Sequence, residues 1–177
     1  MIQLTYAIVV EKHGYAYVNI AKAGCTSVKF AIARHVGVPF ETLMYHYPWK
    51  RMVHDIPEDI FRFTVVRHPL ARLVSCWADY VVEPRNRELK MNPEFYTYHG
   101  LTFEEFAKSV FRRPIPNPHY APQWPQIAGH VSKIIRLEQI KSEWPRLMSQ
   151  FGLPYIPHRR KSRHDDWWTY YTDDLMA

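Results

Sequence analysis

A short stretch, NIAKAGCTSVK at residues 19–29, brings together a cation, a glycine and two hydroxyl groups: Lys22, Gly24, Thr26 and Ser27. The ammonium group supplies a point charge, the glycine lets the backbone approach a ligand closely, and the hydroxyl groups can donate hydrogen bonds. An apolar run precedes the stretch and a helical pattern follows it, and helix N-termini bind anions. The stretch therefore predicts a site for a phosphate or sulfate group. The structural alternative is a tight turn at Gly24, a helix cap at Thr26 and a solvated Lys22.

A second stretch with cations, FTVVRHPLARLVSCWADYV at residues 63–81, also follows an apolar run. Arg67 stands where a strand would end, and Ser75 lies two helical turns further on, so both are expected to reach one phosphate group. A guanidinium group binds phosphate through two parallel hydrogen bonds. Arg72 and Ser75 share the helix face opposite the apolar positions, so neither is expected in a core. The structural alternative for Arg67 is a surface ion pair.

The hydrophobic pattern indicates which elements must position these residues. The expected order is strands at 4–10 and 15–20, a helix from Thr26 to Gly37, a buried strand at 61–66, a helix from Pro69, an irregular segment at 83–100, a helix from Thr102, a proline-rich loop at 112–126, a buried strand at 131–137, and a helix that Ser142 caps and Gly152 ends. This alternation predicts an α/β fold with a mainly parallel sheet flanked by helices and a P-loop-like loop at 19–29. The last residues, YYTDDLMA, carry a helix-start signal with almost no helix after it, so we expect a terminal helix that is truncated or frayed.

Composition limits the class of protein. The chain has 177 residues, of which 47% are hydrophobic, and this predicts a single domain over residues 1–177. No apolar run has the length of a membrane helix, and the start lacks the basic segment and cleavage site of a signal peptide. Cys25 and Cys76 lack metal-ligand spacing, so we expect reduced thiols, no metal and a soluble, cytoplasmic protein. The formal net charge of +6 favours anionic partners.

The first stretch differs from the phosphate loop of nucleoside-triphosphatases. That loop, GxxxxGK[ST], places its lysine directly before the hydroxyl residue, whereas here Lys22 precedes Gly24. The run FTVV also ends in Arg67, where a nucleoside-triphosphatase has an acidic ligand for Mg²⁺. Both differences argue against a kinase or a GTPase.

Together the two stretches resemble those of the sulfotransferases that use 3′-phosphoadenosine 5′-phosphosulfate (PAPS), particularly the carbohydrate sulfotransferase branch. NIAKAGCTSVK is similar to the family's 5′-phosphosulfate loop, PKxGxTS, and the second stretch is similar to its 3′-phosphate motif, RxPxxRLxSxY. Ala21 replaces the usual proline, and SCWADY departs from the usual SxY. Segments at 134–154 and 159–175 also resemble the family, so the likeness covers most of the chain.

The resemblance implies a reaction, a cofactor and a set of cofactor-binding residues. The reaction is in-line transfer of a sulfuryl group from PAPS to a hydroxyl acceptor, with adenosine 3′,5′-bisphosphate as product and no required metal. Lys22 is expected to stabilise the leaving phosphate oxygen, and the segment RRKS to close over the 3′-phosphate, with a solvated basic tail as the alternative for RRKS. The residues expected to bind the cofactor are Lys22, Ala23, Gly24, Cys25, Thr26, Ser27, Arg67, Ser75, Arg160 and Lys161.

Transfer to a hydroxyl group also needs a base, and histidine titrates near neutral pH. His46 is preferred, because a histidine at the end of the strand before the Arg67 strand resembles the catalytic histidine of several sulfotransferases. His54 and His119 are rivals, the latter because similar branches carry a histidine and a tryptophan in a proline-rich acceptor-side loop. Glu41 is a further alternative, since some members of the family use a carboxylate.

The acceptor is less well specified than the cofactor. Aromatic residues in FYTYHG and HYAPQW, together with Lys108, Arg112 and Arg113, favour a saccharide that is already anionic. A small alcohol, a phenol and a peptide tyrosine remain alternatives, and the same aromatic residues would also suit a small core. The competing hypotheses for the whole chain are a nucleotide kinase, a basic nucleic-acid-binding domain and an inactive relative that only binds nucleotide. The preferred hypothesis involves no nucleic acid and no membrane span.

Overall fold

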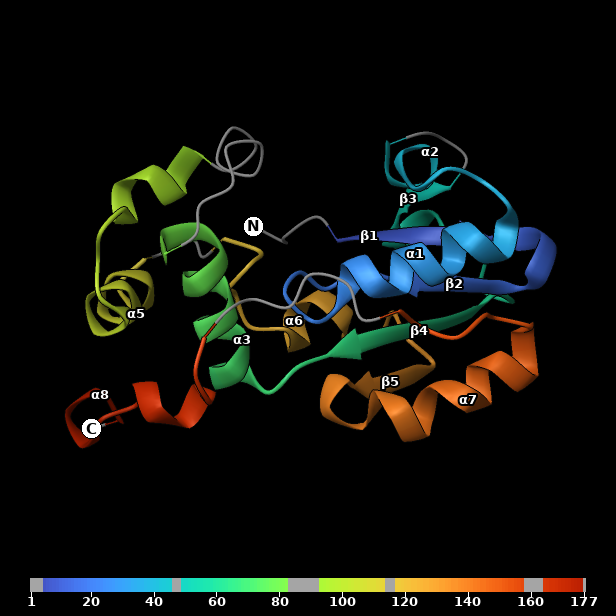
Figure 1. Cartoon of the computed structure of the whole chain (residues 1–177). Coiled ribbons are helices and arrows are strands. Elements are labelled where there is room, and N and C mark those ends of the chain that lie inside the picture. The colour runs from blue at the N-terminus through green and yellow to red at the C-terminus, as the bar shows by residue number, and fades with distance from the viewer. Residues whose placement is uncertain (1–4, 46–48, 83–92, 114–116, 158–163, 177) are drawn as a thin grey trace. The chain divides into compact units, whose positions relative to one another are not determined.

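The computed structural model describes residues 5–45, 49–82, 93–113, 117–157 and 164–176, and the chain forms two compact units (Figure 1). Unit 1 comprises Met1–Arg67 and Pro122–Arg160, and unit 2 comprises His68–Ala121 and Lys161–Ala177. Strands and helices alternate, and the expected α/β fold is confirmed. A single domain over residues 1–177 stays a prediction.

Unit 1 contains a five-stranded mixed sheet with the order β3-β1-β2-β4-β5. The strands are β1 (Tyr6–Val10), β2 (Tyr15–Val18), β3 (Lys50–Met52), β4 (Phe61–Val66) and β5 (Lys133–Arg136). Strands β2, β4 and β5 are parallel, whereas β1 is antiparallel to both β2 and β3. The antiparallel part exists because the turn between β1 and β2 is too short for a crossover connection. The parallel part of the sheet is the one that carries both motifs.

The helices of unit 1 cover both faces of this sheet. They are η1 (Glu11–His13), α1 (Cys25–Val36), α2 (Phe40–Tyr45), η2 (Val53–Asp55), α6 (Trp124–Ile127), η5 (Leu137–Gln139) and α7 (Ile140–Phe151). Alternating residues of β2 show the two layers. Tyr15 and Tyr17 belong to a core that includes buried residues of α1 and α7, whereas Ala16 and Val18 belong to a second core that includes Ile127 of α6. Both faces of the central strands are therefore buried, as the apolar runs predicted.

Three local predictions in unit 1 are wrong. The segment 112–126 is not loop throughout, because α6 begins at Trp124 with a proline in its first turn. Helix α7 begins at Ile140, and Ser142 does not cap it; the Ser142 hydroxyl donates to the carbonyl oxygen of Gln139 (2.9 Å). Strand β5 lies at the edge of the sheet and is only partly buried, so Ile134 is 40% exposed.

Unit 2 is helical and has a core rich in aromatic side chains. Its elements are α3 (Pro69–Trp77), η3 (Ala78–Val82), η4 (Pro93–Tyr98), α5 (Phe103–Phe111), η6 (Trp167–Tyr170) and α8 (Asp173–Met176). The predicted start of α5 is confirmed, since Thr102 and Glu105 form a reciprocal capping box. A single helical turn follows Thr172, as its helix-start signal predicted.

Two histidines of unit 1 lie against each other. The rings of His13 and His35 meet edge to face with their centroids 4.2 Å apart, and the Tyr15 ring lies 5.9 Å from His35. Burial, and then the neighbouring His13, lower the pKa of His35 below its ordinary value of 6.5. The neutral imidazole is therefore the form that the fold accommodates.

This pair predicts a loss of stability in mild acid. Below pH 6.5 the unfolded chain binds a proton at His35 before the folded chain does, so the free energy of unfolding should fall as the pH drops toward the lowered pKa. Urea unfolding of wild type and His35→Gln between pH 5 and pH 8 measures this effect, with the exposed His99→Gln as control. Wild type and His99→Gln should lose more stability on acidification than His35→Gln. Equal pH dependence in all three proteins would contradict the assignment.

Candidate functional site

Hydrogen bonds hold the backbone where the loop between β2 and α1 begins. The Thr64 hydroxyl donates a buried hydrogen bond to the carbonyl oxygen of Val18 (2.8 Å). The backbone N–H of Asn19 donates to the carbonyl oxygen of Tyr6 (3.1 Å). Because β2 and β4 are parallel and pair Val18 with Thr64, the loop after β2 and Arg67 after β4 lie at the same edge of the sheet. In α/β proteins, ligands bind at this carboxyl edge.

The backbone of the loop is left-handed at two positions. Lys22 has a φ of 64° and Gly24 a φ of 75°, and they flank Ala23, which is fully buried. Among the residues that the structure describes, Lys22 alone has a positive φ without being glycine. This conformation costs an L-residue about 1–2 kcal/mol, and such strain is concentrated at functional sites. A lysine at this position therefore costs the loop conformational free energy.

The loop ends at an uncapped helix N-terminus. Gly24 is the N-cap of α1, no side chain caps the helix, and its first turn contains no acidic residue. The first helical hydrogen bond runs from the N–H of Val28 to the carbonyl oxygen of Gly24, so the N–H groups of Cys25 and Thr26 have no acceptor within the helix. A cap at Thr26, the structural alternative, is wrong. These N–H groups and the helix dipole favour an oxyanion.

A close contact with a side chain also favours glycine at position 24. A Cβ atom at this position would lie 2.8 Å from Cδ1 of Leu137, the first residue after β5. The alternation of left-handed Gly24 with helical Cys25 aligns successive N–H groups in the manner of an anion-binding nest. The left-handed φ thus makes glycine the preferred residue here, and an added Cβ would in addition displace the Leu137 side chain.

Arg67 is held through its peptide groups. The side-chain amide of Gln123 donates from Nε2 to the carbonyl oxygen of Arg67 (2.7 Å) and accepts from the Arg67 N–H at Oε1 (3.0 Å). Gln123 thus extends the hydrogen bonding of β4 by one residue and fixes the base of the arginine side chain. Sequence reasoning missed Gln123, because these two positions are 56 residues apart and no local pattern connects them.

Ser75 and Arg72 lie in unit 2, where the structure contradicts one expectation. Arg72 is 2% exposed and Ser75 is 3% exposed, so both lie in the core. Arg72 donates through its guanidinium group to the carbonyl oxygens of Ala121 (2.7 Å) and Pro118. Arg72 is buried because the turn at 117–121 covers it and accepts hydrogen bonds from its guanidinium group.

The candidate bases differ in how firmly they are held. His54 is exposed, with 65% of its side chain accessible, and contacts Asp55 (3.3 Å). His119 is half-buried, and its Nδ1 lies 2.7 Å from Oδ1 of Asn117. Glu41 is exposed in the first turn of α2. His46, Arg160 and Lys161 lie outside the described residues.

The aromatic residues proposed for the acceptor fall into two groups. Phe95 and Tyr98 belong to the core of unit 2, as the structural alternative predicted. Tyr96 in unit 2 and Trp124 in unit 1 are 54% and 67% exposed and remain candidates for sugar contacts. Arg113 lies over the Tyr98 ring, 5.3 Å from its centroid.

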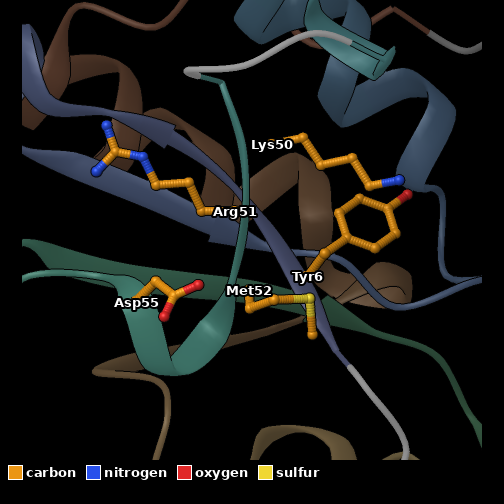
Figure 2. Close-up of a pocket in the computed structure, with 5 residues that line it drawn as sticks. All are labelled: Tyr6, Lys50, Arg51, Met52 and Asp55. Carbon is orange, nitrogen blue, oxygen red and sulfur yellow. The ribbon is translucent and has the colours of Figure 1, made fainter.

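Sequence reasoning missed a depression of about 530 Å³ at the β1–β3 edge of unit 1 (Figure 2). Its lining residues are Tyr6, Lys50, Arg51, Met52 and Asp55. Lys50 lies over the Tyr6 ring, with Nζ 4.4 Å from the centroid, and the buried Lys29 of α1 donates to the Tyr6 hydroxyl (2.9 Å). Arg51 pairs with Glu11 (2.6 Å). Two lysines thus meet at one phenol ring, next to the strand end from which the loop begins.

In the part of the chain that the structure describes, no group of three or more His, Cys, Asp or Glu side chains could hold a metal ion, and both cysteines are free thiols. No helix in this part of the chain is long and apolar enough to cross a lipid bilayer.

Comparison with known proteins identifies one family. No curated protein and no solved structure matches the chain. The model of the sulfotransferase family matches residues 5–172, a span that contains both motifs and the strands and helices that position them. Because this match covers nearly the whole sequence, the chain belongs to the sulfotransferase family and is a transferase of sulfuryl groups.

Proposed function

We propose that the chain transfers the sulfuryl group of PAPS to a hydroxyl acceptor, and that the acceptor is a saccharide. The observation that carries the proposal is the loop before α1, where Lys22 and Gly24 are left-handed and the helix N-terminus has neither a capping side chain nor an acidic residue. N–H groups beside a cation, with no carboxylate in the first turn, fit a doubly negative oxyanion. Membership of the sulfotransferase family indicates which oxyanion the loop binds, because sulfotransferases act on an anionic sulfuryl donor.

The proposed roles follow from position and chemistry. When bound, PAPS supplies an activated sulfuryl group. Residues 22–27 hold its 5′-phosphosulfate, and Lys22 neutralises negative charge that develops on the leaving phosphate oxygen. Arg67, whose backbone Gln123 holds at the same sheet edge, binds the 3′-phosphate as a fork of donors. Ser75, Arg160 and Lys161 complete the proposed set of contacts.

The acceptor hydroxyl must lose a proton as the new bond forms. His119 is our preferred base among the described candidates, because Asn117 holds its ring, whereas His54 is mainly exposed. His46 and Glu41 stay as alternatives. A saccharide that already bears a negative charge is supported in unit 1 by Lys50 at the Tyr6 depression and by the exposed ring of Trp124.

Binding of adenosine 3′,5′-bisphosphate tests the cofactor assignment. Lys22→Ala and Arg67→Ala each remove a charge-assisted contact, so each should weaken binding by about 2 kcal/mol or more, roughly 30-fold or more. Titration calorimetry measures this loss, with Lys141→Ala and Arg34→Ala as charge-matched controls on exposed helix positions. The assignment would be refuted if Lys22→Ala and Arg67→Ala bound the bisphosphate as tightly as wild type. It would also be refuted if wild type bound ATP with Mg²⁺ more tightly than the bisphosphate.

The backbone of the loop can be tested separately from its charges. Gly24→Ala and Gly37→Ala both place a Cβ at a left-handed residue that caps α1, with φ values of 75° and 72°, but only a Cβ at position 24 would contact Leu137. Each substitution should lower the free energy of unfolding by about 1–2 kcal/mol. Only Gly24→Ala should also weaken binding of the bisphosphate, by about tenfold or more because the N–H groups are displaced. Equal affinities of the two variants in calorimetry would argue against a backbone cradle at Gly24.

Acceptor class is tested by release of the bisphosphate from PAPS. The probes are an unsulfated polysaccharide with carboxylate groups, p-nitrophenol and a tyrosine-containing peptide. Lys50→Ala should raise the KM for the polysaccharide several-fold, because a phenol-stacked lysine is lost from the depression, and should leave the KM for PAPS unchanged. Turnover of p-nitrophenol or the peptide in place of the polysaccharide would overturn the saccharide assignment.

A further inference from the structure

His119 lies at the end of a short line of hydrogen bonds in unit 2. Nδ2 of Asn117 donates to Oε2 of Glu94 (3.0 Å), and Oδ1 of Asn117 accepts from the backbone N–H of His119 (3.0 Å). The same Oδ1 lies 2.7 Å from ring Nδ1 of His119. A carboxylate, an amide and an imidazole therefore follow one another without interruption.

The chemistry of these groups determines which way each one faces. A carboxylate only accepts hydrogen bonds, so the side of Asn117 that faces Glu94 must be its NH₂ group. The opposite side is then Oδ1, and the backbone N–H of His119 independently requires an acceptor there. An amide oxygen cannot donate, so Nδ1 of the neutral ring must carry the hydrogen. The lone pair of the neutral imidazole is consequently on Nε2.

The carboxylate at the start of the line is itself held by a phenol. Tyr120 donates to Oε1 of Glu94, and the Tyr98 hydroxyl lies 3.5 Å from the same oxygen. Burial, and then hydrogen bonds with Glu94 and Tyr98, raise the pKa of Tyr120, so its hydroxyl remains a donor. Glu94 thus has acceptor sites occupied by Asn117 and by Tyr120.

Contacts hold both the backbone around His119 and its ring. The buried guanidinium group of Arg72 binds the carbonyl oxygens of Pro118 and Ala121, which bracket His119 in the chain. The ring meets Tyr80 edge to face, with centroids 4.9 Å apart, and meets Phe95 in the same way at 5.9 Å. Backbone, ring plane and tautomer are therefore all specified.

We propose that Glu94 and Asn117 are positioning residues that keep His119 in the Nδ1–H tautomer and so present Nε2 as the base for the acceptor hydroxyl. This inference rests on the proposed sulfuryl transfer. In that step the acceptor oxygen forms a bond to sulfur, the bond from sulfur to the phosphate oxygen breaks, and its electron pair stays on the phosphate. The hydroxyl proton moves to Nε2, which gives an imidazolium with Nδ1–H still bonded to Asn117; no proton passes to Asn117 or Glu94.

The tautomer can be read directly by ¹⁵N NMR of the full chain labelled at histidine nitrogens, with His119→Gln to assign the signal. Wild type at neutral pH should show a protonated Nδ1 and an unprotonated Nε2. Asn117→Ala should lose this signature, whereas Gln150→Ala, which removes an exposed amide from α7, should keep it. A wild-type ring protonated at Nε2, or an unchanged signature in Asn117→Ala, would overturn the proposal.

Activity and cofactor binding complete the test. With PAPS and the best of the three acceptor probes, Asn117→Ala and Glu94→Ala should lower kcat by about 10-fold to 100-fold, because a positioned base contributes roughly 10²–10⁴. Binding of the bisphosphate and the far-ultraviolet circular dichroism should not change, and Glu94→Gln should retain more activity than Glu94→Ala. An unchanged kcat in Asn117→Ala would overturn the positioning role.

Failure of the sulfotransferase assignment would look different from failure of the positioning role. In the first case wild type would bind neither the bisphosphate nor PAPS while the NMR signature stayed as expected. In the second case binding and transfer would be normal and the signature or its dependence on Asn117 would be absent.

Discussion

Parallel pairing of β2 with β4 is the constraint on which the candidate cofactor site depends. Val18 and Thr64 are partners in this pairing, and the Thr64 hydroxyl binds the Val18 carbonyl, so the two strands end side by side. The loop and Arg67 follow directly from these strand ends. A shift of this register by one residue would move every side chain of β2 between the two cores and would separate the loop from Arg67.

The parts of the fold that were predictable from sequence are those governed by local patterns. The hairpin around EKHG, the helix after Gly24, the capping box at Thr102 and the helix end at Gly152 all follow from short-range rules, and all are present. The errors occur where distant contacts dominate. Arg72 was placed outside the core because its helix face contains polar residues, but a turn nearly 50 residues away covers that face and uses the guanidinium group as a donor.

The candidate site shows the same division between local and distant information. Lys22, Gly24 and Arg67 were recognisable because their types and spacing suit an oxyanion, and the family match covers all three. Gln123 and Glu94 were not recognisable, because their partners Arg67 and Asn117 lie 56 and 23 residues away in the chain. His119 was found only as one histidine among several. His119 differs from the other candidate histidines in the hydrogen bonds that orient it, and sequence spacing does not reveal those.

The left-handed backbone at Lys22 has a consequence for engineering this chain. Glycine would adopt the same φ without steric penalty, and asparagine would do so more easily than lysine. A selection for thermal tolerance alone would therefore favour removal of the lysine, with a gain of about 1 kcal/mol. Resistance to heat and retention of a cation at this loop are opposing demands on one residue, and a stabilised version of the protein would have to obtain its extra stability elsewhere.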